Sequence, residues 1–314
     1  MVLFRRPRTS ARRLLTIVVH QHSVSFCIAE LAAHAAEPSS LVLNDQVEAR
    51  TGAWVETIEK LLQQYKRFLQ PDMPVQLVLG LSLYQSVLID RPQLPAEELA
   101  SGLKFALREL VSLSPSQIIA DYYELPAQPA GSDKINVVVA DKKQLVPLLN
   151  CLSDAKLAVQ GISVVELANA RLVTDTVEPI MFLLQRAGEP IVVQIVSEEK
   201  LFLSRQVRGF EKLADYSTDE LNMGALEPLS VEMQRSLDYF DSQLRQRPVA
   251  AIQCALPFSP ASEVHEALQQ QLGLKVSGLA YPPWAQDLAA GDFSDSAALG
   301  GTLLLLDELM AEAS

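Results

Sequence analysis

The sequence predicts a duplicated α/β protein, because both halves of the chain show a strand hairpin followed by a helix and a further strand. The length of 314 residues supports this division, since it corresponds to about two domains of ordinary size. Hydrophobic residues make up 49% and charged residues 20%, a composition that supports an apolar core and excludes a disordered chain. The two halves are too dissimilar in sequence to count as a repeat.

The first half begins with short runs rich in Val, Ile and Phe, which predict strands at 14–19, 24–31 and 41–47. Apolar residues then recur at helical spacing and predict an amphipathic helix over 53–69. A strand over 75–80 follows it.

A compact block of mixed elements comes next. Strands are predicted at 85–90, 117–125, 135–140 and 159–166, with a turn-rich loop over 126–132. Pro95 opens a helix whose apolar face is formed by Leu99, Leu103, Ala106, Leu107 and Leu110. A second helix is predicted over 141–154.

The second half repeats this order. Residues 191–196 and 201–207 predict a hairpin about Ser197-Glu198-Glu199, and apolar residues spaced by three and four predict a long helix over 229–244. A strand over 250–255, a helix over 261–272, a strand over 275–279 and a final helix over 296–311 complete the chain.

Positive charge is concentrated at one end of an otherwise acidic chain. The formal net charge is −12, yet the first 13 positions hold no acid and five of the 26 basic residues, namely Arg5, Arg6, Arg8, Arg12 and Arg13. The remaining 21 basic residues face 38 acidic ones, a balance of −17. Such a body argues against nucleic-acid binding. The basic segment, which opens Met-Val-Leu-Phe, either meets anionic lipid or an acidic partner, or is a frayed terminus.

The sequence favours a cytoplasmic protein. No apolar run reaches the roughly 18–20 residues that a membrane helix needs, and the run at 14–19 is too short for a secretory signal. The three cysteines, Cys27, Cys151 and Cys254, are scattered and odd in number, which argues against a disulfide framework or a zinc site. A reducing compartment fits this cysteine usage.

Sequence motifs of common enzymes are absent. The chain has no Gly-x-Gly-x-x-Gly, Walker, Gly-x-Ser-x-Gly or His-Glu-x-x-His motif. His20 and His22 lie two residues apart, and two imidazoles on one strand face can begin a metal site, with His34 or His265 as the available third histidine. A polar turn between two strands explains the pair equally well.

The predicted long helix carries a charged face. Glu232, Arg235 and Asp238 lie at steps of three residues, a spacing typical of solvent-exposed ion pairs that contribute little stability.

Four blocks of the chain resemble PilM-type proteins in the order found in that family. Residues 92–125 resemble the inserted subdomain of that family, with Leu-Pro, an acidic pair, a helix, Ser-Pro and Asp-Tyr in succession, and residues 135–166 resemble its next block. Residues 201–209, Leu-Phe-Leu-Ser-Arg-Gln-Val-Arg-Gly, resemble a hairpin strand of the family. Residues 231–240, Val-Glu-Met-Gln-Arg-Ser-Leu-Asp-Tyr-Phe, resemble one of its helices. The narrower likeness is to the MshI-type members found in mannose-sensitive haemagglutinin (MSHA) type IV pilus systems.

The resemblance implies an actin-like fold of the PilM and FtsA kind, in which duplicated RNase H-like α/β domains flank a cleft. On this basis residues 1–13 are a basic N-terminal segment, 14–74 begin the first half, and 75–155 form a small inserted α/β subdomain. The chain returns to the first half over 156–189 and forms the second half over 190–314.

The chain departs from the family where nucleotide binds. Actin-like ATPases hold metal and phosphates with two Asp-x-Gly turns, because carboxylates position Mg²⁺ and glycine lets backbone N–H groups approach phosphate. The first turn aligns with Val18-Val19-His20, the second with Gln194-Ile195-Val196, and the Gly-Gly pair near adenosine with Ala255-Leu256.

What remains of the family's nucleotide site is small. By resemblance, Glu232 and Arg235 persist at positions that border the base and ribose, so we expect a degenerate site without catalytic residues, metal or cofactor. The alternative is a rearranged site in which His20, Gln194 and Arg205 contact phosphate without Mg²⁺. Gly300-Gly301 either serves a ligand or allows close helix packing.

The resemblance therefore implies a non-catalytic pilus assembly protein that is peripheral to the inner membrane of a Gram-negative bacterium. The expected partner is the N-terminal cytoplasmic tail of a PilN-like inner-membrane protein, bound in a groove near residues 84–125 and 135–140, and membrane association is then indirect. A pilus assembly ATPase is a further expected partner. The alternatives are an ATP-binding actin-like switch in pilus assembly or type II secretion, and an unrelated metal enzyme built on His20 and His22.

Overall fold

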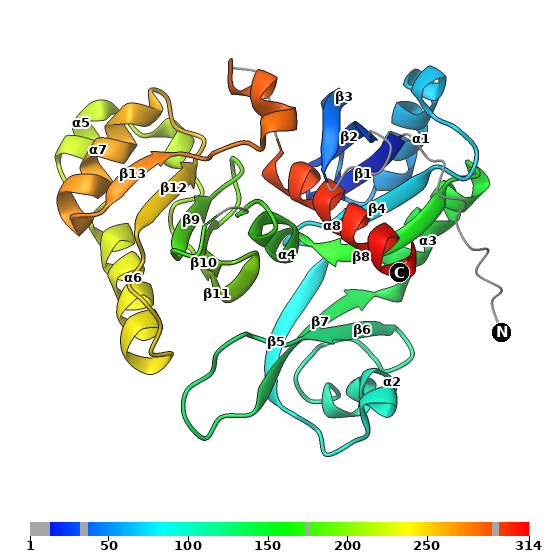
Figure 1. The fold of residues 1–314 in the computed structure, drawn as a ribbon, viewed down its shortest axis with the longest axis horizontal. Coiled ribbons are helices and arrows are strands. Elements are labelled where there is room, and N and C mark those ends of the chain that lie inside the picture. Colours follow the sequence, from blue (N-terminus) through cyan, green and yellow to red (C-terminus); the bar gives the residue numbers. More distant parts are fainter. Residues whose placement is uncertain (1–12, 32–36, 174–175, 291–294, 314) are drawn as a thin grey trace. The chain divides into compact units, whose positions relative to one another are not determined.

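The computed structural model describes residues 13–31, 37–173, 176–290 and 295–313 (Figure 1). The chain forms two compact units. Unit 1 comprises Met1–Tyr123, Ile135–Leu172 and Tyr281–Ser314, and unit 2 comprises Glu124–Lys134 and Val173–Ala280.

Unit 1 is built on a mixed sheet that, in the described part of the chain, has five strands in the order β3-β2-β1-β4-β8. Strands β1, β2 and β3 form an antiparallel meander, whereas β1, β4 and β8 run parallel. The strands are β1 (Arg13–Val19), β2 (Ser23–Leu31), β3 (Pro38–Glu48), β4 (Pro74–Leu79) and β8 (Ala158–Val164).

Helices cover both faces of this sheet, because the strands carry apolar side chains on both. Leu15, Ile17 and Val19 of β1 join a core with α1 (Trp54–Gln64) and α3 (Lys142–Asp154). Val18 joins a second core with α4 (Val165–Ala170) and α8 (Ser296–Ala313). The short helices η1 (Lys66–Phe68) and η4 (Pro283–Ala290) belong to the same unit.

A small sheet is inserted into unit 1 after β4. Figure 1 shows that β5 extends away from the larger sheet and that β6, β7 and α2 lie beside it. The order of its described strands is β5-β7-β6, and Leu99, Leu103 and Leu107 pack on it from α2 and its C-terminal end. These elements are β5 (Tyr84–Asp90), α2 (Ala96–Ala106), β6 (Ile118–Tyr123) and β7 (Lys134–Asp141).

Unit 2 repeats the topology of unit 1. Its described strands have the order β11-β10-β9-β12-β13, with β9, β10 and β11 antiparallel and β9, β12 and β13 parallel. The strands are β9 (Ile180–Leu184), β10 (Ile191–Ser197), β11 (Lys200–Val207), β12 (Ala251–Ala255) and β13 (Lys275–Gly278).

Helices α6 and α7 pack against the core of this second sheet, to which they contribute Leu229, Met233, Val264 and Leu268. The helices of unit 2 are η2 (Leu213–Asp215), α5 (Thr218–Asn222), α6 (Glu227–Asp238), the π-helical turn η3 (Tyr239–Gln243) and α7 (Ala261–Leu272). The prediction of a duplicated α/β protein with an inserted subdomain is therefore confirmed at the level of architecture.

The structure corrects several predicted elements. Strand β9 was not predicted: its sequence Ile-Met-Phe-Leu-Leu has Ile180 as its single β-branched residue, whereas the runs predicted as strands are richer in Val, Ile and Thr. The predicted strand over 159–166 ends at Val164, where α4 begins, and the helix over 53–69 ends at Gln64 before η1. Leu110 lies beyond α2 and is 53% exposed, so it is not part of the buried helix face.

The unit boundaries also differ from the predicted ones. Strand β4 and helix α3, placed in an insert over 75–155, belong to the large sheet of unit 1 and its core, so the small sheet begins at Tyr84. Strand β9, placed in the first half, lies in the sheet of unit 2, and α8, placed in the second half, packs in unit 1. Which unit an element joins depends on contacts between distant parts of the chain, and these contacts leave no local pattern in the sequence.

Two glycines explain how α8 approaches the sheet of unit 1. A Cβ atom on Gly300 would lie 1.8 Å from the backbone oxygen of Ala168 in α4. A Cβ atom on Gly301 would lie 2.8 Å from side-chain methyl groups of Thr16 and Val78. Close packing therefore accounts for this glycine pair, the second of the two roles considered from the sequence.

We predict that Gly300→Ala destabilises the protein by about 1–3 kcal/mol, because backbone has to move to admit the methyl group. Urea unfolding monitored by circular dichroism measures the change. Gly278→Ala is the matched control, since its Cβ would meet its nearest neighbour, His265, at an ordinary 3.9 Å. Equal stability of Gly300→Ala and the wild type would contradict the packing argument.

Candidate functional site

The parallel strands of unit 1 end at one edge of the sheet, here called the carboxyl edge. Because β1, β4 and β8 run parallel, the residues that follow them gather there, and this is where open α/β sheets bind ligands. His20 follows β1, Gly80 follows β4, and Glu166 is the second residue of α4 after β8.

His20 is fixed at the carboxyl edge by a buried hydrogen-bond network. Its Nε2 lies 2.6 Å from Asp295 Oδ2, and Ser25 Oγ donates to the same oxygen at 2.6 Å. All three side chains are buried, with at most 4% of the residue exposed. Because a carboxylate only accepts hydrogen bonds, Nε2 of His20 carries the proton of this contact. The imidazole is thus held in one orientation.

Asp295 also caps α8. The backbone N–H of Ala297 donates to Asp295 Oδ1 at 3.0 Å, which satisfies one of the free donors at the start of the helix. A helix N-terminus is a natural site for an anion such as phosphate. Here a carboxylate of the chain itself stands at that place, and both of its oxygens are engaged.

Gly80 is required where the first hairpin turn passes β4. Its N–H donates to the carbonyl of Val19 at 2.8 Å. A Cβ atom would lie 2.7 Å from that carbonyl oxygen and 3.0 Å from His20 Nδ1. The imidazole of His20 therefore lies between Gly80 on one side and Asp295 on the other.

A second buried carboxyl group lies at the same edge. The hydroxyl of Tyr84, the first residue of β5, donates to Glu166 Oε2. Burial raises the pKa of Glu166 to about 7, while its backbone hydrogen bond acts in the opposite direction. Glu166 thus links α4 to the root of the inserted subdomain through a group that titrates near neutral pH.

In unit 2 the second turn was predicted at the wrong place. Gln194, Ile195 and Val196 lie inside β10, paired with β9 and β11, and not in a turn. In the duplicated topology β9 takes the place of β1, so the equivalent of Val18-Val19-His20 is Leu183-Leu184-Gln185. The unbroken apolar run before the turn at 185–190 is the signal that could have revealed this strand.

Gln185 organises the turn after β9. Its Nε2 donates to the carbonyls of Glu189 and Phe210, at 2.8 and 2.7 Å. Its backbone N–H donates to the carbonyl of Ala255 at the end of β12, at 2.9 Å. Val18, which the sequence comparison aligned with an aspartate of actin-like ATPases, and its topological equivalent Leu183 are both apolar and fully buried.

The charged face predicted on the long helix is present on α6. Glu232 receives Arg205 Nη2 on one carboxylate oxygen and Arg235 Nη1 on the other, each at 2.5 Å. Arg205 and Arg235 are 38% and 66% exposed, so these pairs contribute little stability. Asp238 accepts a hydrogen bond from Gln234 at 2.8 Å. Glu232 and Arg235 thus lie in one cluster, and Arg205 of β11 is its third member.

The other candidate residues belong to different elements. Of the alternative phosphate contacts, His20 belongs to unit 1, whereas Gln194 and Arg205 belong to unit 2. His22 lies 3.4 Å from Thr51 Oγ1, and His34 is outside the described residues. Among the residues described, no three His, Cys, Asp or Glu side chains are grouped to hold a metal ion.

The cysteine thiols are free and buried. Burial raises the pKa of both the Cys27 and the Cys254 thiol to about 12, and that of Cys151 to about 11. Thiols of this kind are not nucleophiles near neutral pH.

Comparisons with known proteins identify the fold of the chain. The chain matches no protein-family model and no curated protein. Among solved structures it is similar to a PilM–PilN type IV pilus biogenesis complex, with a TM-score of 0.62 and 14% identity over 96% of this chain and 98% of that one. A Bacteroides thetaiotaomicron protein with an actin-like ATPase fold and unknown function gives 0.51 and 10% identity over 90% and 97%.

The chain has the actin-like ATPase fold. The cytoplasmic domain of EpsL, an inner-membrane component of the type II secretion system of Vibrio cholerae, aligns with a TM-score of 0.48 and 13% identity over 96% of this chain and 94% of that one. Identities this low establish a fold and not a function. Among the helices described, none is both long enough and apolar enough to cross a membrane.

We predict that Glu166 makes stability depend on pH. Between about pH 4.5 and 7 the unfolded chain has lost this proton while the folded chain keeps it, so stability falls as pH rises through that window. The Glu166→Gln variant should not show this fall. Above pH 7 its free energy of unfolding should exceed that of the wild type by about 3 kcal/mol at most. Urea unfolding of both proteins between about pH 5 and 8 measures it.

The exposed Glu109 provides the control. Glu109→Gln is expected to leave the pH profile of the wild type unchanged. Parallel profiles for Glu166→Gln and the wild type would contradict the assignment.

Proposed function

We propose that this protein is a non-catalytic cytoplasmic assembly protein of a type IV pilus of the MSHA kind. In this proposal it binds the cytoplasmic tail of a PilN-like inner-membrane protein. The observation that carries the proposal is the likeness to PilM, which was solved together with PilN and aligns with 96% of this chain. The four sequence blocks that resemble PilM-type proteins support it independently.

The two hairpin turns support the absence of catalysis. Apolar residues, Val18 and Leu183, stand at the strand-end positions where the Asp-x-Gly turns of actin-like ATPases carry their aspartates, so no carboxylate for Mg²⁺ is offered at either of these two positions. In unit 1 the Asp295 carboxylate occupies the start of α8, where it would repel a phosphate group. In unit 2 both oxygens of Glu232 are engaged by arginines. These features support a protein that works without nucleotide turnover.

The inserted subdomain is the proposed docking surface for the PilN-like tail. Strand β5 is an edge strand, and an edge presents backbone groups to which an extended peptide can add as a further strand. Leu88 of β5 is 51% exposed, Leu94 just before α2 is 42% exposed, and Phe105 of α2 is 72% exposed. Leu88 stands on the edge strand itself and offers an apolar anchor to a peptide that adds there.

We predict that a peptide of the PilN-like tail from the same locus binds the purified protein and that Leu88→Asp weakens this binding tenfold or more, about 1.4 kcal/mol. Fluorescence anisotropy of a labelled peptide measures the affinity. Val177→Asp is the matched control, because Val177 lies in unit 2 and is 57% exposed. Equal losses in the two variants, or no binding by a folded sample, would remove the support for this docking surface.

We further predict that Mg-ATP changes neither peptide affinity nor melting temperature. A nucleotide that bound the folded state would raise the free energy of unfolding by about 2.7 kcal/mol at a hundredfold excess over the dissociation constant, and the melting temperature would rise with it. Differential scanning fluorimetry with and without Mg-ATP tests this. A clear upward shift, with binding that requires ATP, would favour the alternative of an actin-like ATPase switch.

A further inference from the structure

The Asp-Tyr pair noted in the sequence lies on an edge strand of the inserted subdomain. These residues are Asp121 and Tyr122 of β6, which ends the described strand order β5-β7-β6. Asp121 is exposed, and its Oδ1 accepts the backbone N–H of Tyr122 at 2.8 Å. The carboxylate therefore holds the backbone donor that directly follows it in the chain.

This backbone N–H points away from the small sheet. The N–H of Lys142 donates to the carbonyl of Gln117 at 2.8 Å, which makes these residues a hydrogen-bonded pair at one end of the β6–β7 ladder. Hydrogen-bonded and non-hydrogen-bonded pairs alternate along antiparallel strands. Ile118, Ala120 and Tyr122 consequently direct their backbone groups outward, so the N–H of Tyr122 is one of the donors that a further strand would need.

Strand β3, at one end of the unit 1 sheet, has the same arrangement. The N–H of Gln46 donates to Asp45 Oδ1 at 2.8 Å. This N–H also points outward, because the N–H of Ala49 donates to the carbonyl of His22 at 2.8 Å and fixes the alternation of the β2–β3 ladder. The hydroxyl of Tyr65 in turn holds the other oxygen of Asp45.

Strand β13, at one end of the unit 2 sheet, uses a side chain from a helix instead. The N–H of Val276 donates to Gln269 Oε1 of α7 at 3.2 Å. The N–H of Leu279 donates inward to the carbonyl of Cys254 at 2.9 Å, and backbone groups three residues apart along a strand point to opposite sides. Each of the three described sheets thus has one edge strand on which a side-chain oxygen takes an outward backbone donor.

The outer side of β6 is complementary to itself. If a second copy pairs with it antiparallel about a two-fold axis at Ala120, Ile118 lies opposite Tyr122 of that copy, on the sheet face that α2 covers. Aromatic and β-branched side chains opposite each other stabilise a sheet. The same pairing sets Asp121 opposite Ile119 of the second copy, so the carboxylate is the unfavourable member of this contact.

We propose that Asp121 closes the β6 edge against pairing with a second copy of this chain. Its carboxylate holds the Tyr122 N–H that pairing needs, and its negative charge meets the carbonyl oxygens of an approaching strand. Within the proposed function, this closure confines strand addition on the small sheet to β5. The inference does not rest on that function, because its test contains no peptide and the two proposals fail separately.

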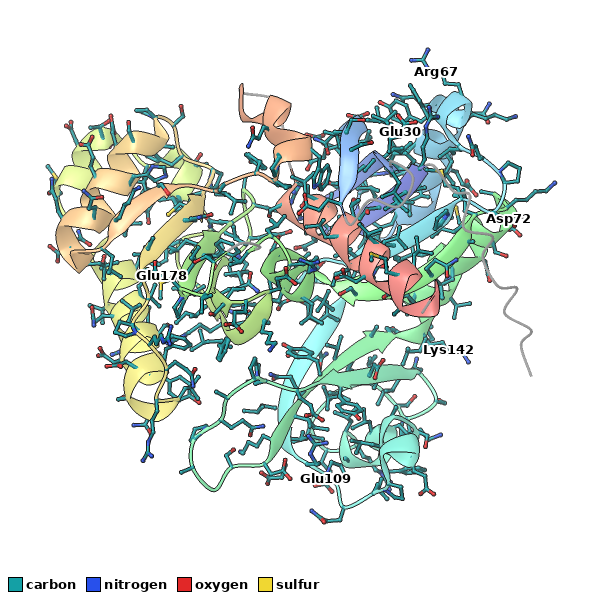
Figure 2. All side chains as sticks on the ribbon, in the orientation of Figure 1. Glu30, Arg67, Asp72, Glu109, Lys142 and Glu178 are labelled. Carbon is teal, nitrogen blue, oxygen red and sulfur yellow. The ribbon has the colours of Figure 1, made fainter. Side chains whose placement is uncertain are left out.

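The test is the self-association of the full chain, measured by sedimentation velocity over a range of protein concentrations. Asp121→Ala releases two backbone donors per dimer, so it should dimerise about tenfold or more tightly than the wild type. Asp121→Asn keeps a side-chain oxygen for the Tyr122 N–H and should remain close to the wild type. Glu109→Ala is the matched control, because it removes another exposed carboxylate from the inserted subdomain, where Figure 2 shows Glu109.

A cysteine at the two-fold axis locates the contact. Hydrogen-bonded residues across antiparallel strands have Cα atoms about 5.5 Å apart, a separation that a disulfide can span. With oxidised glutathione as the oxidant, the double variant Ala120→Cys, Asp121→Ala should form a disulfide-linked dimer, and Ala120→Cys alone should form far less of it. The native cysteines do not compete, because all three are buried.

The outcomes decide the proposal. Tighter dimerisation of Asp121→Ala, with the disulfide at position 120, supports it. A monomeric Asp121→Ala with the circular dichroism spectrum of the wild type would overturn it, as would dimers that form no disulfide at this position. Equal association of Glu109→Ala would reduce the effect to net charge and overturn it. If Asp121→Asn associated like Asp121→Ala, the hydrogen bond to Tyr122 would not close the edge and the proposal would fail.

Discussion

The Asp295 carboxylate is the interaction on which the arrangement of unit 1 depends. It joins residues 275 positions apart, because Oδ2 accepts from His20 and Oδ1 accepts from the first turn of α8. These hydrogen bonds hold α8 against the hairpin formed by β1 and β2. Gly300 and Gly301 then let the helix lie directly against α4 and the sheet, where Thr16 and Thr302 meet at 2.8 Å. A buried carboxylate of this kind is stable because its hydrogen bonds replace those of water.

Each of the two hairpin turns is closed by hydrogen bonds of the chain itself, which is why neither carries nucleotide chemistry in our proposal. In unit 1 the helix N-terminus that could receive a phosphate is already satisfied, and the imidazole of His20 fills the space that Gly80 leaves. In unit 2 the Gln185 amide binds two backbone carbonyls and so holds its turn from within. Both turns are stabilised by the chain itself, whereas a nucleotide site needs donors left available for a ligand.

Periodicity was enough to predict most elements, but the assembly of the units depends on contacts that have no local pattern. The Val-, Ile- and Phe-rich runs of β1 and β2 and the spacing in α6 were visible in the sequence, as was the ion pair between Glu232 and Arg235 one helical turn apart. The place of α8 was not, because it depends on Asp295 and two glycines meeting partners from the start of the chain. Strand β9, like β1, is apolar on both faces, but it holds a single β-branched residue and so lacks the composition by which β1 was predicted. Because β9 was missed, the second turn was predicted at Gln194 instead of Gln185.

The two edges of the unit 1 sheet differ in chemistry because parallel strands keep the segments that enter the sheet apart from the segments that leave it. The entering segments carry Arg13, Lys66 and Lys156, whereas the leaving segments carry the His20–Asp295 network, Glu166 and the inserted subdomain. In our proposal the peptide binds at the inserted subdomain, which follows the carboxyl end of β4. The edge at which the parallel strands enter the sheet stays clear of that surface. Strand polarity is the cause, because every parallel strand enters the sheet at one edge and leaves it at the other.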